Sequence, residues 1–145
     1  VGVSVILTIV TALAVFLRLI EEFDRSRVGE TPKIAAKDVE INYREEGKGV
    51  ALVLLHGLSD DSALWEPLIP EFSKRYRTIT VDIRGHGFSS KPEMPYSIEL
   101  FSEDLSGFLE KLGIYQAHLI GLSMGGAIVQ QFALDHPEKV RSLTL

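Results

Sequence analysis

Residues 117–129 read AHLIGLSMGGAIV and contain the pattern Gly-x-Ser-x-Gly at positions 121–125. A mostly apolar run leads into the pattern and another leads out of it, as expected where a strand turns sharply into a helix. Such a turn strains the backbone of its central serine, and glycines two residues to either side relieve the crowding. The pattern therefore predicts Ser123 as a nucleophile, flanked by Gly121 and Gly125. The alternative is a glycine-rich loop that serves only close strand–helix packing.

Outward from this segment, strand-like and helix-like stretches alternate along the chain. Short apolar or β-branched runs predict strands, and apolar residues at helical spacing predict helices between them. Helical patterns of ten or more residues between strands indicate βαβ units. The sequence therefore predicts an α/β fold with a mostly parallel sheet flanked by helices. The expected strands are 38–43, 51–55, 78–83, 117–120 and 140–145, and the expected helices are 63–74, 98–112 and 124–134.

The amino-terminal stretch is apolar, and residues 1–17 carry no charged side chain. Extended to residue 20, it would span about 30 Å as a helix, roughly a bilayer core. We therefore expect an apolar N-terminal helix, a transmembrane anchor over residues 1–20, in a single-pass membrane protein whose membrane side stays open. The alternatives are a secretory signal peptide, giving a secreted or periplasmic product, and a buried core helix. A charged, mixed composition predicts a linker over 21–36, and the folded domain is expected over 37–145.

The composition excludes several classes of function. The chain of 145 residues has no cysteine, which rules out disulfides, thiolate metal sites and a cysteine nucleophile. Its formal net charge of -5 argues against nucleic acid as a partner, because phosphate contacts need clustered Lys and Arg. No pattern implies a metal or an organic cofactor, and none indicates an oligomeric state.

A second chemical segment, His56-Gly57-Leu58, directly follows the apolar run at 51–55. A backbone N–H at this strand end can donate to an oxyanion, together with the N–H of the residue after the nucleophile. We therefore expect the main-chain N–H groups of Leu58 and Met124 to form an oxyanion hole. His56 is expected to brace the loop, because in sites of this kind the catalytic histidine follows the nucleophile in chain order.

A third segment, DIRGHGFS, occupies residues 82–89. Its Gly85-x-Gly87 could begin a dinucleotide-binding motif, but serine replaces the third glycine and a proline-containing run follows. That run prevents the helix whose N-terminus would hold a pyrophosphate. A structured loop near the mouth of the site fits better, with Asp82 and Arg84 as an internal ion pair.

Together the three segments resemble the α/β-hydrolase family over residues 38–145, in particular its small esterases, enol-lactonases and cofactor-free haloperoxidases. In such proteins a serine attacks an acyl carbonyl, a histidine removes its proton and an aspartate orients the histidine. The resemblance implies that the aspartate and the histidine follow later strands. The chain would then hold only the first part of the domain, ending after about the sixth strand, and would be inactive alone. The resemblance is carried by His56-Gly57, by Asp82-x-Arg84-Gly85-His86-Gly87-x-Ser89, and by Gly121-Leu122-Ser123-Met124-Gly125-Gly126.

Other acidic and histidine residues of the chain have simpler interpretations than a triad role. His118 is expected as a packed side chain within a strand, and Asp104 on the solvated face of a helix. Asp60 and Asp61 are expected as helix caps. Asp135-His136 reads as the end of a helix.

The leading interpretation is a serine hydrolase that cleaves an ester, a lactone or a similar small-molecule acyl substrate. Perhydrolysis or carbon–carbon bond hydrolysis on the same fold remains an alternative, as does a non-catalytic hydrolase-fold binding module. An intact serine between flanking glycines counts against the binding module, since binding alone needs no strained turn. Fold by itself cannot decide between these functions.

Overall fold

The computed structural model describes residues 31–93 and 95–145. The predicted anchor at 1–20 and most of the predicted linker lie outside the described residues. Within the described ranges, no helix has the length and apolar character needed to cross a membrane. Residues 32–145 form one folded unit.

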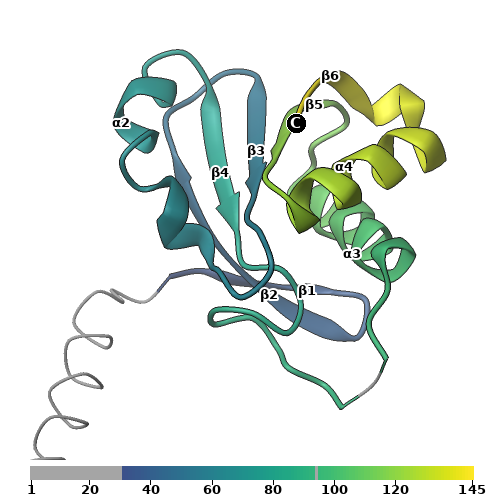
Figure 1. The fold of residues 1–145 in the computed structure, drawn as a ribbon. Coiled ribbons are helices and arrows are strands. Elements are labelled where there is room, and N and C mark those ends of the chain that lie inside the picture. Colours follow the sequence, from purple (N-terminus) through teal and green to yellow (C-terminus); the bar gives the residue numbers. More distant parts are fainter. Residues whose placement is uncertain (1–30, 94) are drawn as a thin grey trace, which may run out of the picture. The chain divides into compact units, whose positions relative to one another are not determined.

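Six strands of this unit form one mixed sheet in the order β1-β2-β4-β3-β5-β6 (Figure 1). Strands β4, β3, β5 and β6 run parallel, whereas β2 pairs with β4, and β1 with β2, in antiparallel fashion. The predicted α/β fold is confirmed, with the difference that two antiparallel strands extend the parallel sheet. The strands are β1 Lys33–Ala36, β2 Val39–Glu46, β3 Ala51–Leu55, β4 Arg77–Val81, β5 Ala117–Gly121 and β6 Val140–Thr144.

The β1–β2 hairpin corrects the predicted start of the domain. The sequence assigns residues 33–36 to a linker, yet they pair with β2 up to Ala36 opposite Val39. The folded domain therefore begins before residue 37. The two-residue turn consists of Lys37 and Asp38, and Lys37 has a φ of 56° although it is not glycine. Because the turn lacks the glycine or asparagine usual at such positions, its sequence gives no hairpin signal.

Helices cover both faces of the sheet. α3 (Ile98–Lys111) and α4 (Met124–Asp135) pack against one face and against each other, while α2 (Ile69–Phe72) lies on the other (Figure 1). Alternate residues of β3 enter two separate apolar clusters, with Val53 and Leu55 in the larger one beneath α3 and α4. Burial on both faces explains why β3 reads as a continuous apolar run.

The helix predicted at 63–74 is broken in the structure. A 3-10 helix, η1 (Ser62–Trp65), is followed after three residues by the single turn of α2. Pro67 and Pro70 explain the break, because neither has the backbone N–H that a continuous helix requires. Asp61 does cap η1 as predicted, accepting the N–H of Ala63 at 2.8 Å.

Candidate active site

Ser123 forms the turn between β5 and α4. Its φ of 53° and ψ of −114° lie outside the regions that non-glycine residues ordinarily adopt. Strained backbone of this kind persists only where the surrounding structure enforces it, and it concentrates at functional sites. The residue is exposed, so its hydroxyl is open to an incoming molecule.

The two flanking glycines make this turn sterically possible. A Cβ on Gly121 would collide with the carbonyl of Gly125, within the turn itself. A Cβ on Gly125 would collide with the carbonyl of Leu55 and lie 2.6 Å from that of His56. The turn at Ser123, called here the elbow, therefore packs its backbone directly against the backbone at the end of β3. A side chain at position 125 would prevent this contact.

The loop that follows β3 lies directly against Ser123. A Cβ built on Gly57 would be 3.5 Å from the Cβ of Ser123 and 4.0 Å from its Oγ. The next residue, Leu58, is followed by Ser59 with a φ of 62°. Among the described residues, no acceptor receives the backbone N–H of Leu58 or of Met124. These two donors lie in different places. Met124 follows Ser123 in sequence, and Leu58 lies in the loop that follows the neighbouring strand β3.

His56 ties this loop to the loop after β4. Its Nε2 accepts the N–H of Ile83 at 3.0 Å, and its Nδ1 lies 2.7 Å from the carbonyl oxygen of Gly57. These two contacts assign the proton to Nδ1 and leave Nε2 as the acceptor of a neutral ring. The ring is fully buried beside His86, and burial lowers the pKa of His56 below its ordinary value.

This lowered pKa predicts an acid-sensitive contribution to stability. The unfolded chain binds a proton at His56 near pH 6.5, whereas the folded chain resists it until lower pH. The contribution is complete above pH 6.5 and is lost as the pH falls toward the folded pKa, by at most about 1.4 kcal/mol per pH unit. In urea titrations between pH 7.5 and 5.5, the wild-type chain should lose more stability than His56→Gln, whose amide oxygen can still accept. Identical pH slopes for the two proteins would contradict this.

Asp82 is a buried carboxylate whose partners are neutral N–H donors. Its Oδ1 accepts the backbone N–H of Ser62 at 2.8 Å. Its Oδ2 accepts from the Asn42 side chain at 2.9 Å and from the N–H of Phe88 at 2.8 Å. The hydroxyl of Ser89 donates to the main-chain oxygen of Asp82 at 2.6 Å. The sequence gives no signal for the contacts of Asn42 and Ser62 with Asp82, because both residues lie far from Asp82 along the chain.

The predicted ion pair between Asp82 and Arg84 is wrong. Arg84 has no exposed surface and pairs with Asp104 through two hydrogen bonds, Nε to Oδ2 at 2.6 Å and Nη2 to Oδ1 at 2.7 Å. It also donates to both oxygens of Asp38 in the β1–β2 turn. The chain leaves β4 at Val81 and turns, so Asp82 and Arg84 contact different elements.

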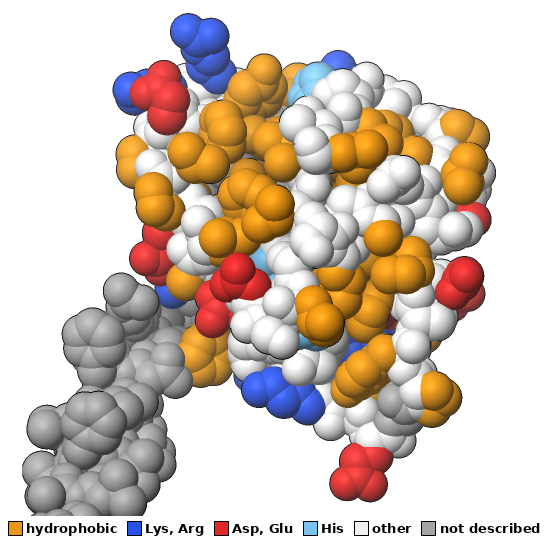
Figure 2. Space-filling model, in the orientation of Figure 1, with side chains coloured by type: hydrophobic (Ala, Val, Ile, Leu, Met, Phe, Trp, Pro, Cys, Tyr) orange, Lys and Arg blue, Asp and Glu red, His pale blue; other side chains and the backbone are white. Residues whose placement is uncertain are grey.

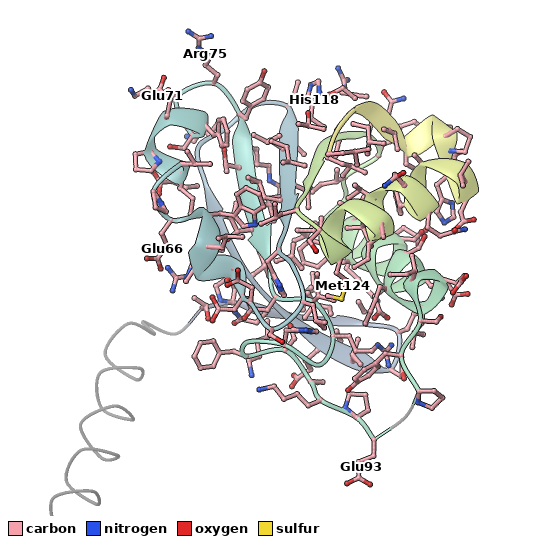
Figure 3. All side chains as sticks on the ribbon, viewed as in Figure 1. Glu66, Glu71, Arg75, Glu93, His118 and Met124 are labelled. Carbon is pink, nitrogen blue, oxygen red and sulfur yellow. The ribbon has the colours of Figure 1, made fainter. Side chains whose placement is uncertain are left out.

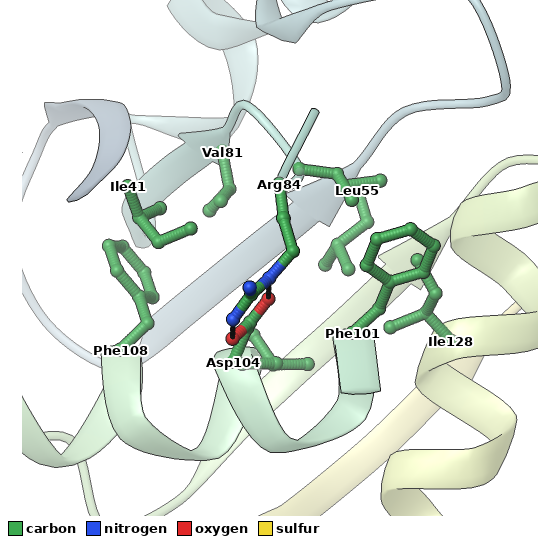
Figure 4. A pocket seen from close by; sticks show the side chains of 10 residues that line it. Ile41, Leu55, Val81, Arg84, Phe101, Asp104, Phe108 and Ile128 are labelled. Carbon is green, nitrogen blue, oxygen red and sulfur yellow. Dashed lines mark hydrogen bonds and ion pairs between the residues drawn. The ribbon is translucent and has the colours of Figure 1, made fainter. Parts of the chain in front are cut away.

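Asp104 also differs from its prediction as a solvated residue, since only 4% of it is exposed. It lies three residues after Phe101 and four before Phe108, and this spacing places it on the core face of α3. The pair with Arg84 borders a cavity of about 20 Å³, otherwise lined by apolar side chains (Figure 4). That volume is about the size that holds one water molecule. The Arg84 guanidinium lowers the pKa of Asp38, its more exposed partner.

None of the four histidines hydrogen-bonds to Ser123 within the described residues. His86 contacts the carbonyl of Arg84 through Nδ1 at 3.0 Å. His118 contacts Ser142 Oγ at 2.7 Å, and Figure 3 shows it at the far end of β5 from Met124. Asp135 accepts from Ser102 and Gln131 at the end of α4. The structure therefore places Gly57 against Ser123 and Gly125 against His56, with Leu58 next to Gly57, Gly121 close to Gly125 and Met124 next to Ser123, and leaves His86, His118 and Asp135 in contacts elsewhere.

Known proteins share this architecture. Residues 50–145 match the family model described as the alpha/beta hydrolase fold. The 2-(acetamidomethylene)succinate hydrolase of Mesorhizobium japonicum is 38% identical over 105 residues, which cover 72% of this chain and 38% of that protein. The crystal structure of the enol-lactonase from Burkholderia xenovorans LB400 has a TM-score of 0.75 at 34% identity. The superposed part covers 77% of this chain and 45% of the enol-lactonase chain.

A third similar protein is also a solved structure. The crystal structure of a membrane phospholipase A, a bacterial virulence factor, has a TM-score of 0.76 at 30% identity. The match covers 98% of this chain and 49% of the phospholipase chain. The chain spans less than half the length of each of these three proteins. Its sheet order, its glycine-flanked serine and these similarities together show that the chain belongs to the α/β-hydrolase family.

Proposed function

We propose that the chain is the first part of a serine hydrolase that cleaves an ester, a lactone or a related acyl substrate. The observation that carries the proposal is the exposed Ser123 in a strained turn. The backbone N–H groups of Leu58 and Met124, which have no acceptor in the described part of the chain, support it because they are the donors that an oxyanion would need.

In the proposed reaction, Ser123 Oγ attacks the acyl carbonyl carbon while a histidine takes the hydroxyl proton. The carbonyl oxygen becomes an oxyanion that accepts hydrogen bonds from Leu58 and Met124. Collapse of this intermediate expels the alcohol, which takes up the proton, and leaves an acyl group on Ser123 that water then hydrolyses. A single oxyanion donor is typically worth about 10²–10³ in kcat. Since the histidines of this chain are engaged elsewhere, the proposal places the histidine and its carboxylate beyond residue 145.

Two other functions of the same fold compete with this proposal. Perhydrolysis or carbon–carbon bond hydrolysis would use the same serine with a different pocket. A non-catalytic binding module would not use the serine at all. The strain at Ser123 favours chemistry over binding alone, because a binding surface gains nothing from an unfavourable φ.

A membrane lipid ester is the second candidate substrate. A membrane phospholipase A is among the similar solved structures, with a TM-score of 0.76 at 30% identity. Exposed apolar side chains also flank the site, with Leu58 70% and Leu122 47% exposed. Figure 2 shows hydrophobic side chains in several groups on the viewed face, with many charged side chains toward its rim. Hydrolysis of phospholipid vesicles, compared with soluble short-chain esters, separates the two candidates.

The experiment that tests the proposal is labelling of the complete protein with a fluorophosphonate probe. The probe reacts with activated serines, so the wild-type protein should be labelled and Ser123→Ala should not. The replacement removes one exposed oxygen and should leave the melting temperature unchanged. Absence of labelling in a folded wild-type protein would favour the binding module.

A further inference from the structure

The loop from His56 to Ser62, called here the oxyanion loop, is held at both of its ends by one neighbouring segment. At its start, His56 Nε2 accepts the N–H of Ile83 at 3.0 Å. At its end, the N–H of Ser62 donates to Asp82 Oδ1 at 2.8 Å. Both anchors belong to the segment that directly follows β4. The backbone between these ties carries Leu58, the proposed oxyanion donor.

The middle of the oxyanion loop has few bonds of its own. One internal backbone hydrogen bond, from Asp60 N–H to the Gly57 carbonyl at 3.3 Å, closes a turn around Leu58 and Ser59. Ser59 has a φ of 62°, a conformation that costs a non-glycine residue free energy. Such a conformation persists only under outside constraint, so the two ties at the loop ends are what keep it.

Asp82 is suited to be such a constraint because its carboxylate is held rigidly and is fully buried. Its second oxygen is fixed by Asn42 from β2 and by the Phe88 N–H. Gly87, with a φ of 48°, passes so close that a Cβ there would collide with the carboxylate. The Asp82 carboxylate accepts three N–H bonds, and hydrogen bonds to a carboxylate are stronger than those to an amide or hydroxyl oxygen.

From this geometry we infer that Asp82 is a positioning residue, which holds the oxyanion loop so that the Leu58 N–H points at the reacting oxygen. His56 holds the other end of the same loop. The inference rests on the proposed function of Ser123 and extends it to a residue that touches neither serine nor substrate. It also gives the segment 82–89 a role, because Gly87 leaves room for the Asp82 carboxylate and the Ser89 hydroxyl donates to the main-chain oxygen of Asp82.

The test compares Asp82→Asn with Asp104→Asn in the complete protein. Both changes neutralise a buried carboxylate, but Asp104 lies on α3 and has no bond to the oxyanion loop. The first readout is the second-order rate of fluorophosphonate labelling at Ser123, measured on folded protein only. We expect Asp82→Asn to slow labelling by tenfold to a hundredfold, and Asp104→Asn by less than threefold. The second readout is hydrogen exchange of the 57–64 backbone amides, which should rise only in Asp82→Asn.

The outcomes separate this inference from the proposed function. No labelling of the wild-type protein overturns both. A labelled wild type with an equally fast Asp82→Asn, or an equal slowing in Asp104→Asn, overturns the positioning role alone. Loosened amides without slower labelling also overturn it.

If Asp82→Asn does not fold, the other tie carries the same comparison. His56→Leu removes the acceptor of the Ile83 N–H, whereas His56→Gln keeps an oxygen within reach. Slower labelling in His56→Leu with rescue in His56→Gln supports the inference. Equal rates in the two variants overturn it.

Discussion

Arg84→Met is expected to lower the free energy of unfolding by about 3–5 kcal/mol, because it leaves a buried carboxylate without its cation. That carboxylate is Asp104, which now meets the guanidinium with two short hydrogen bonds. The double replacement Arg84→Met with Asp104→Leu should recover most of the loss, since apolar side chains of similar volume commonly replace such pairs at little cost. The apolar lining of the adjoining cavity makes this site receptive to them.

Equilibrium denaturation of the three proteins measures the effect. Asp38→Asn serves as the control, because Asp38 is the exposed partner of the same guanidinium and its loss should change the denaturation midpoint little. If the single and double replacements lose equal stability, Arg84 acts through its packing and not through its charge.

Gly125→Ala is expected to cost about 3 kcal/mol or more, since the added methyl has to enter space occupied by backbone. The obstructing carbonyls belong to Leu55 and His56, at the end of β3, and cannot rotate away as a side chain could. The variant should therefore lose both thermal stability and probe labelling at Ser123.

Gly107→Ala provides the matched control for this change. Gly107 lies within α3, and a Cβ there would have its nearest neighbours at ordinary contact distances of 3.6 and 3.7 Å. Replacing a helical glycine where a methyl group meets its neighbours at ordinary contact distances should raise stability by roughly 0.5–1 kcal/mol. Similar melting temperatures for the two variants would mean that the elbow does not approach β3 as closely as described.

The features that were predictable from the sequence are those whose causes lie close together in the chain. Strand, serine turn and helix follow one another within residues 117–129, so their pattern can be recognised locally. The same holds for α3, where Ser97 caps the helix by accepting the N–H of Leu100. The sequence also contains the cause of the break in the helix predicted at 63–74, because Pro67 and Pro70 lie within that stretch.

The unpredicted features depend on partners that are distant in sequence. β1 is an exception, since its partner β2 follows after two residues, but the Lys37-Asp38 turn between them has no glycine or asparagine to indicate a hairpin. The Asp82 carboxylate accepts hydrogen bonds from residues of β2 and η1, and the sequence around Asp82 contains no pattern that predicts these donors. Asp104 is an intermediate case, since its helical spacing from Phe101 indicated the core face although its charge suggested solvent.

The strand order of the sheet has a consequence for how this protein folds while the ribosome synthesises it. The central strand β3 pairs with β4 soon after both are made, but its other neighbour, β5, begins only at Ala117. At about 5–20 residues per second, translation takes roughly 3–13 s to travel from Ala51 to Ala117. During that interval one edge of a wholly apolar strand has no partner. Nascent chains should therefore engage holdase chaperones most strongly between the emergence of β4 and that of β5.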